Sequence, residues 1–267
     1  MVKTLVLAGM GTNSHKETAH AASLAGSDIV NIVHFADIAS GKTNLLAYQF
    51  LVFPGGFMDG DDLGAAQAAS VRWRYMKTGN QLSLLEHLYK FLDNGGVILG
   101  ICNGFQLLVK LGLLPGIEKK IYTRSVSLAQ NNSAKFENRW VTLKINPASN
   151  CIFTKNLSSL KLPVRHGEGR VVIKNEAFDS IVKNNLHVLT YINRFVETEK
   201  PSYPDNPNGS EVDVAGLTDP SGRILGLMPH PEAFHHFSNH PSWTRRIGDA
   251  PGTLLFANAV NYIRNNL

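Results

Sequence analysis

Cys102 stands where a buried strand is expected to end and a helix to begin, in the stretch VILGICNGFQLLVKLG. Gly100 and Gly104 lie two residues before it and two residues after it. This G-x-C-x-G spacing is typical of a nucleophile elbow, where small residues let strand and helix pack closely around a strained turn. A helix N-terminus favours a reactive thiolate and directs backbone N–H groups at an oxyanion. Cys102 is therefore a candidate nucleophile, although a cysteine in such a place can also be a small buried apolar residue.

A thiol nucleophile needs a base that moves its proton, and that base needs a group that orients it. His230 and Glu232 follow an apolar strand in LGLMPHPEAF, and Pro229 and Pro231 restrict the backbone there. A residue two positions on can share a side with the histidine and bond its far ring nitrogen. We therefore predict a triad of Cys102, His230 and Glu232.

Three more histidines, His235, His236 and His240, come shortly after the triad histidine. No cysteine or well-spaced carboxylate accompanies them, so we expect loop histidines and no metal site. Residues 240–243 could instead line the rim of the site.

The elements that must position these residues alternate between strand and helix in the first half of the chain, which predicts an α/β fold with a mostly parallel sheet. Strands are expected at TLVLAG, DIVNIVH, QFLVFPGG and VILGI, and helices at HKETAHAASLAG and QLSLLEHLYKFLD. Shorter segments at RWVTLKI, LPVRHGEG, RVVIK and HVLTYI predict a small antiparallel extension. KPSYPDNPNGSEVD predicts a long ordered loop, VAGLTDPSGRILGLM a pair of strands, and GTLLFANAVNYIRNNL a closing amphipathic helix.

The composition is that of an ordinary globular protein. Among 267 residues, 43% are hydrophobic and 18% charged, and the net charge of +5 comes from scattered lysines and arginines rather than a patch that nucleic acid would bind. No composition shift marks a linker, so we expect a single domain over residues 1–267. The sequence contains no stretch typical of a signal peptide or a membrane span. It has two cysteines and no C-x-x-C motif, so we expect no disulfide. These two observations favour a cytoplasmic protein.

Cys102, His230 and Glu232 resemble the triad of class I glutamine amidotransferases, whose flavodoxin-like α/β sheet carries the cysteine on an elbow. The match narrows in the segments around the triad, which are similar to the PurQ-type glutaminase subunits of phosphoribosylformylglycinamidine synthase. These segments are GTNSHKETAHA, FPGGFMDGDDLGAA, GICNGFQLLVKLGLLPG, RHGEGR, YPDNPNGS and GLMPHPE. The chain departs from that pattern at Met58 and Asp59, where many members have Ser-Tyr, so a contact made by those side chains is in doubt.

The resemblance implies hydrolysis of glutamine through a thioester on Cys102, with loss of ammonia. It places an oxyanion hole at the backbone N–H groups of Gly56, in preference to Gly55, and Asn103. It also implies substrate contacts from Gln106, Ser133, Phe136, Arg139 and His166. Glu168 and His166 could alternatively lie at a subunit interface or in a glycine-rich turn. No cofactor is implied for this chain.

Ammonia used in biosynthesis must reach a synthetase, and the sequence contains no phosphate-binding G-x-x-x-x-G-K-[ST] motif of its own. We therefore expect an ATP- and magnesium-dependent synthetase subunit as partner, with a small third subunit possible, and low activity without that partner. The alternatives are a stand-alone hydrolase similar to γ-glutamyl hydrolases, and a regulatory subunit with a silent site. The intact triad argues against the second.

Overall fold

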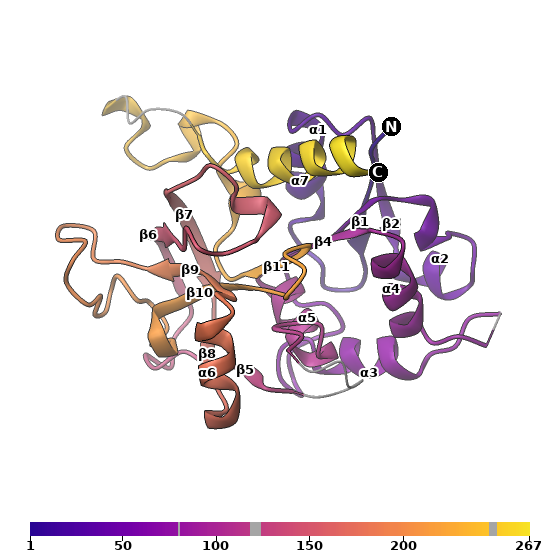
Figure 1. Ribbon diagram of the computed structural model, residues 1–267, viewed down its shortest axis with the longest axis horizontal. Helices are drawn as coiled ribbons and strands as arrows, with labels where there is room; N and C mark the ends of the chain where they lie inside the picture. Colours follow the sequence, from indigo (N-terminus) through magenta and orange to yellow (C-terminus); the bar gives the residue numbers. More distant parts are fainter. Residues whose placement is uncertain (80, 118–123, 246–249) are drawn as a thin grey trace.

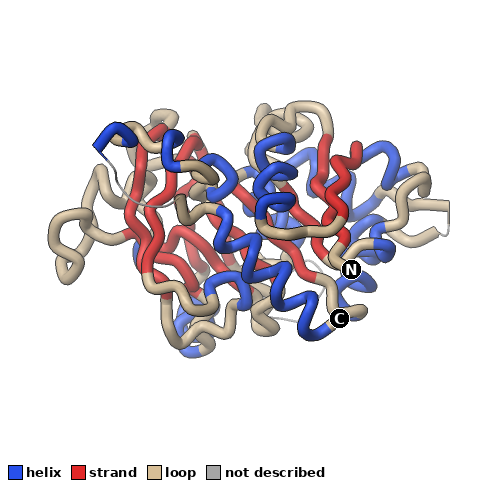
Figure 2. Tube along the Cα trace, turned by 90° about the horizontal axis from the view of Figure 1, so that it is seen from above, coloured by secondary structure: helices blue, strands red, loops and turns tan. Residues whose placement is uncertain are grey.

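The structure, a computed structural model, describes residues 1–79, 81–117, 124–245 and 250–267. In these residues one nine-stranded sheet runs through the molecule, with helices on both of its faces (Figures 1 and 2). The strand order is β2-β1-β3-β4-β11-β10-β9-β6-β7. The predicted α/β fold, with a mostly parallel sheet and an antiparallel extension, is confirmed.

The first five strands in this order are mutually parallel. Those next to the site are buried along their whole length, as strands covered on both faces should be. The VILGI segment forms one of these interior strands, as predicted. In spatial order the five are β2 (Ile29–His34), β1 (Lys3–Ala8), β3 (Phe50–Phe53), β4 (Val97–Ile101) and β11 (Ile224–Leu227).

The antiparallel part of the sheet begins with the hairpin between β10 (Val214–Thr218) and β11, which is the predicted strand pair around DPSG. It continues through β9 (His187–Tyr191), β6 (Glu137–Ile145) and β7 (Ser159–His166). A separate antiparallel pair consists of β5 (Val126–Gln130) and β8 (Glu168–Ile173). The extension is therefore nearly as wide as the parallel part.

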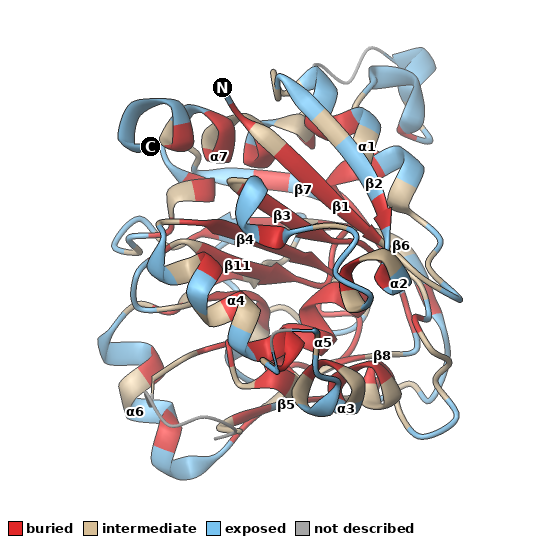
Figure 3. Ribbon diagram, turned by 90° about the vertical axis from the view of Figure 1, so that its right-hand side faces the viewer, coloured by how far each residue is buried: buried red, intermediate tan, exposed pale blue. Residues whose placement is uncertain are grey.

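The helices lie in two layers (Figure 3). α1 (His15–Leu24) and α7 (Thr253–Asn266) cover one face, and α3 (Gln67–Tyr75), α4 (Leu84–Asp93) and α5 (Asn103–Leu111) cover the other. The short α2 (Phe35–Ala39) follows β2, and α6 (Asn175–Lys183) follows β8. In the described part of the chain, no helix has both the length and the apolar character that crossing a membrane requires.

α4 shows how the local sequence fixes the strand that carries Cys102. Ser83 and Glu86 form a capping box: Ser83 Oγ accepts the Glu86 N–H at 3.2 Å, and Glu86 Oε2 accepts the Ser83 N–H at 2.6 Å. Leu84, Leu85, Leu88 and Phe91 are buried. With its start capped and one face buried, α4 leads the chain through Gly95 and Gly96 directly into β4.

Candidate active site

The order of the strands brings Cys102 and His230 together. β4 and β11 are parallel neighbours, with Gly226 opposite Gly100 and Leu227 opposite Ile101. Cys102 follows β4 directly and donates its N–H to Leu227 O at 2.8 Å, and His230 comes three residues later. Because carboxyl ends of parallel strands meet at one edge of a sheet, the two side chains lie at the same edge.

The turn at Cys102 has the backbone of a nucleophile elbow. Cys102 has φ +51° and ψ −103°, a conformation that costs a non-glycine residue about 1–3 kcal/mol. A Cβ on Gly104 would lie 1.9 Å from Phe53 O, and a Cβ on Gly100 would lie 2.9 Å from the Gly104 backbone. Both glycines of the G-x-C-x-G spacing therefore allow close packing of strand and helix around the cysteine.

His230 and Glu232 form a buried pair. His230 Nδ1 lies 2.6 Å from Glu232 Oε1, and the His230 N–H donates to Pro163 O at 2.8 Å. His230 Nε2 is buried and makes no hydrogen bond to the described residues. Burial disfavours the imidazolium, but the Glu232 carboxylate and the nearby Cys102 outweigh it and raise the pKa of His230 to about 10. A proton is thus held beside the sulfur at neutral pH.

The loop after β3 presents the other wall of the site. Gly56 has φ +140°, and a Cβ there would lie 2.6 Å from Asn13 N, so only glycine fits this backbone. Its N–H has no acceptor among the described residues, and the same holds for the N–H of Asn103 at the first turn of α5. Both predicted oxyanion donors are therefore free to bond a ligand.

A pocket of about 150 Å³ adjoins Cys102. Three of the predicted substrate contacts, Gln106, Phe136 and His166, line it, and Ser133 and Arg139 do not. Its lining comprises Asn13, Ser14, Gly55, Gly56, Phe57, Asp61, Cys102, Gln106, Phe136, Arg165, His166, Gly167, Glu168 and His230.

Ser133 and Arg139 converge on a buried carboxylate instead. Ser133 Oγ donates to Glu137 Oε1 at 2.5 Å, and Arg139 Nε donates to Glu137 Oε2 at 2.9 Å. The guanidinium also lies over the Tyr203 ring. Arg139 neutralises the Glu137 carboxylate and Ser133 donates a hydrogen bond to it, so in this structure the two residues anchor the first residue of β6 and do not line the pocket.

Gln106 lines the pocket, but both ends of its amide are already bonded. Its Nε2 donates to Glu168 O at 2.7 Å, and its Oε1 accepts from Asn103 Nδ2 at 3.1 Å. Asn103 Oδ1 accepts the Met58 N–H at 3.1 Å. This chain of bonds ties the loop after β3 to the β7–β8 turn across the start of α5.

His166 is held as a neutral imidazole. Asn131 Nδ2 donates to the carbonyls of His166 and Lys135, so its Oδ1 accepts the proton of His166 Nδ1 at 3.1 Å. Burial, reinforced by the charge on His230, lowers the pKa of His166 to about 3. His166 Nε2 is therefore an acceptor, and no described residue bonds it.

Several residues that shape the site carry no recognisable chemical signal in the sequence. A Cβ on Gly55 would lie 2.7 Å from His230 Cε1, so this glycine admits the imidazole. Asn208, in the predicted loop YPDNPNGS, donates to Gly169 O at 2.9 Å and so holds the start of β8. Both residues lie in segments that resemble the family. That resemblance alone does not indicate which atoms each residue contacts.

The departure at Met58 and Asp59 has a local structural explanation. Met58 is buried against Gly9, and a Cβ on that glycine would lie 3.3 Å from Met58 Cε. Asp59 forms an ion pair with Arg72, whose guanidinium also lies 3.9 Å from the centre of the Phe35 ring. The two residues fix the loop to α3 and the strand layer.

The histidines after the triad pack outside the pocket. His235 Nδ1 lies 3.0 Å from Glu232 O, and its ring meets His20 edge-on. His240 is buried against Trp140 and Phe234. Residues 240–243 do not line the pocket beside Cys102, and the described residues contain no group of three potential ligands placed to hold a metal.

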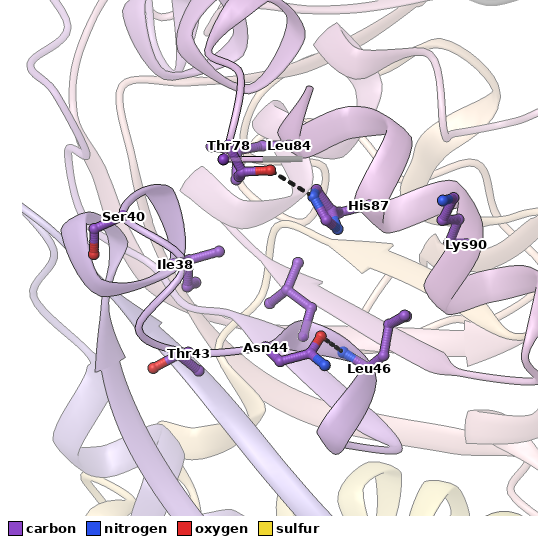
Figure 4. Close-up of a pocket in the computed structure, with 12 residues that line it drawn as sticks. Ile38, Ser40, Thr43, Asn44, Leu46, Thr78, Leu84, His87 and Lys90 are labelled. Atoms are coloured by element: carbon purple, nitrogen blue, oxygen red, sulfur yellow. Dashed lines mark hydrogen bonds between the residues drawn. The ribbon is translucent and has the colours of Figure 1, made fainter. Parts of the chain in front are cut away.

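A second and larger pocket, of about 410 Å³, lies between α2, the segment before β3 and the start of α4 (Figure 4). Figure 4 shows Thr78 bonded to His87 and Asn44 bonded to the Leu46 backbone. Neither Cys102 nor His230 lines it. Larger volume does not identify the reactive site here, because the nucleophile and its base both adjoin the smaller pocket.

A family model and curated relatives assign the chain to the same family. Residues 1–263 match the model of the CobB/CobQ-like glutamine amidotransferase domain. Phosphoribosylformylglycinamidine synthase subunit PurQ of Dehalococcoides mccartyi is 42% identical over 98% of both chains, and that of Archaeoglobus fulgidus is 35% identical over 98% of this chain and 97% of its own.

Solved structures agree with this assignment. A chain in the structure of PurLQS from Thermotoga maritima is 26% identical, with a TM-score of 0.70 over 98% of this chain and 99% of that one. The glutaminase domain of Trypanosoma brucei CTPS, with a TM-score of 0.54 and 16% identity over 98% of this chain and 94% of that chain, shares the fold. The chain belongs to the CobB/CobQ-like glutamine amidotransferases and, among them, to the PurQ-type subunits of phosphoribosylformylglycinamidine synthase.

Proposed function

We propose that this protein is the glutaminase subunit of phosphoribosylformylglycinamidine synthase. It hydrolyses L-glutamine to glutamate and ammonia, and the ammonia serves an ATP-dependent synthetase that converts formylglycinamide ribonucleotide to formylglycinamidine ribonucleotide in purine biosynthesis. The observation that carries the chemistry is Cys102 on an elbow beside the buried His230–Glu232 pair. The full-length relationship to PurQ subunits supports the pathway.

The first half-reaction forms a thioester. The Cys102 thiolate attacks the side-chain carbonyl carbon of glutamine, and the resulting oxyanion accepts hydrogen bonds from the N–H groups of Gly56 and Asn103. His230 gives its proton to the departing nitrogen, and ammonia leaves as the carbonyl re-forms. Glu232 stabilises the imidazolium before that transfer and keeps the ring in the correct orientation.

The second half-reaction releases glutamate. His230, now neutral, takes a proton from a water molecule that attacks the thioester carbon, and a second oxyanion forms in the same hole. That proton restores the imidazolium. Collapse of the oxyanion expels the Cys102 thiolate and leaves a carboxylic acid, which loses its proton to water to give glutamate. The thiolate supplies the nucleophile, the imidazole carries the proton, and water is the second reactant. We therefore assign no cofactor to this chain, and we place ATP and magnesium on the synthetase. We infer a cytoplasmic location from the cysteine usage and the pathway.

The test measures glutamate formation by the purified chain, with and without its synthetase. We expect turnover that rises when the synthetase is added, and loss of turnover in Cys102→Ser. Equal rates with and without the synthetase would favour a stand-alone hydrolase. A glutamine-analogue electrophile should label Cys102, and glutamine should protect Cys102 from it. Absence of labelling would favour the alternative hypothesis of a regulatory subunit with a catalytically silent site.

A further inference from the structure

The side chain of Asn103 has no part in the mechanism above, which uses only the backbone N–H of this residue. Asn103 is only 3% exposed, and it does not line the pocket beside Cys102. Its Oδ1 accepts the Met58 N–H at 3.1 Å, and its Nδ2 donates to Gln106 Oε1 at 3.1 Å. Because the amide is bonded at both ends and lies outside the pocket, it acts on the reaction through its partners and not by touching glutamine.

The loop after β3 is bonded on one side to residues 9–14, which follow β1. Gly56 forms an antiparallel bridge with this segment, and two hydrogen bonds flank the bridge. They run from Phe57 N–H to Gly11 O at 2.8 Å and from Asn13 N–H to Gly55 O at 3.2 Å. In an antiparallel pair flanked in this way, the backbone N–H of the paired residue points away from the partner segment. The Gly56 N–H therefore points to the other side of the loop.

The Met58 N–H points to that same side. Asp59, the next residue, donates its N–H back to Met10 O at 2.9 Å in the segment after β1. The Met58 N–H instead donates to the Asn103 side chain at the start of α5. Among the described residues, this is the one hydrogen bond that joins residues 55–60 to α5.

The two oxyanion donors are consequently linked through a single residue. Asn103 supplies one donor with its own N–H, and its side chain holds the loop two residues beyond Gly56, which supplies the other. An oxyanion hole stabilises the developing charge only when each donor lies about 2.7–3.1 Å from the oxygen that carries it. The bond between Asn103 and Met58 thus fixes the distance between the two donors.

We propose that the Asn103 side chain is a positioning residue for the oxyanion hole, which it serves by holding the Gly56 N–H in line with its own. The inference rests on the glutaminase function and the oxyanion hole proposed above. When the bond is lost, the bonds to the segment after β1 remain, and Gln106 keeps its bond to Glu168 O. Glutamine should therefore still bind, while both tetrahedral intermediates lose the contribution of one donor.

The experiment uses the complex with the synthetase and compares Asn103→Leu and Asn103→Ala with Asn258→Leu. Leucine keeps the branched shape of asparagine without its hydrogen bonds. Asn258, on α7, is the matched control: its Nδ2 donates to Phe153 O at 2.8 Å and to Lys155 O at 2.9 Å, away from the pocket. In both Asn103 variants kcat for ammonia release should fall about 10- to 100-fold, with KM within about threefold of wild type. In Asn258→Leu both constants should stay within about twofold of wild type.

Alkylation of Cys102 by iodoacetamide separates the oxyanion hole from the nucleophile. The thiolate forms a bond to the methylene carbon and iodide leaves, so no oxyanion develops and the hole is not needed. The rate of alkylation and its dependence on pH should therefore match wild type in both Asn103 variants. A slower reaction or a shifted pH dependence would show that the substitution disturbs Cys102 or His230, and would overturn the assignment.

Other outcomes would also refute the inference. These are a wild-type kcat in both Asn103 variants, a raised KM with kcat unchanged, and a fall of kcat in Asn258→Leu that equals theirs. A fall in Asn103→Ala alone would assign the effect to packing, and thermal unfolding shows which variants are folded. If Asn103→Leu does not fold, kcat and alkylation of Asn103→Ala decide. A wild-type complex that releases no ammonia from L-glutamine refutes the proposed function itself, whereas an active wild type with unaffected variants refutes only this inference.

Discussion

Gly55→Ala should displace the catalytic imidazole of His230 while the rest of the fold stays in place. A Cβ at residue 55 would lie 2.7 Å from His230 Cε1, whereas 3.4 Å is the lower limit of ordinary contact, so the ring must retreat by about 0.7 Å. The Gly55 backbone cannot give way easily. Its N–H donates to Ser14 Oγ at 2.9 Å, and its carbonyl accepts the N–H groups of Asn13 and Ser14 at 3.2 Å each.

A misplacement of about 1 Å can lower the rate of a catalysed step about 100-fold. We therefore expect kcat for glutamine to fall about 30- to 100-fold in Gly55→Ala, with a loss of about 1–2 kcal/mol in the free energy of unfolding. Residue 55 has no unusual backbone conformation, so alanine adds steric contact but no dihedral strain.

Gly167→Ala provides the matched control. Gly167 lines the same pocket, and a Cβ there would meet no atom within 4 Å. Steady-state ammonia release and denaturant unfolding should be measured for both variants, in complex with the synthetase for the activity. If Gly55→Ala keeps more than half of the wild-type kcat, the position of the His230 ring does not limit the reaction and the reasoning fails.

Three further predictions follow from the described contacts. Glu232→Gln should lower the pKa of His230 and reduce kcat about 100-fold or more, which the pH profile of ammonia release would show. The pKa of His230 is about 10 in the folded protein and about 6.5 in the unfolded chain. Protonation of His230 therefore contributes fully to the free energy of unfolding below about pH 6.5, and this contribution disappears as the pH rises toward 10. Denaturant unfolding of wild type and His230→Asn at several pH values would measure the difference. Arg139→Ala should cost about 1–3 kcal/mol of stability, because Glu137 loses a charged partner, and leave KM for glutamine unchanged; a raised KM would show that Arg139 reaches the substrate.

The sequence predicts the parallel half of the fold because each of its strands is an apolar run bounded by turn residues. It predicts Cys102 because the elbow needs small residues at fixed spacing, and these are visible without a structure. The sequence pattern does not predict α3 or α6. α3 begins after Ala66 in a left-handed conformation and has no side-chain cap, so the usual start signal is missing.

Local sequence patterns do not predict the order of the strands in the sheet, and that order positions the residues of the site. β11 comes last of the strands in sequence and yet lies between β4 and β10, because the β10–β11 hairpin returns the chain parallel to β4. Asn131 acquires its role only after this arrangement, since its partner His166 lies at the end of a different strand, β7. The same limit applies to Arg139: the resemblance predicts a substrate contact, and the sequence does not indicate that the side chain also binds a neighbouring carboxylate, Glu137.

The two buried histidines of the pocket illustrate how one carboxylate can set two charge states. Burial opposes protonation of both His230 and His166. At His230 the partner of Nδ1 is the charged Glu232, which overcomes burial; at His166 it is the neutral amide of Asn131, which does not. The charge that Glu232 maintains on His230 then helps to keep His166 neutral. The imidazole that must deliver a proton is therefore charged, and its neighbour remains an acceptor, because the negative charge lies beside only one of them.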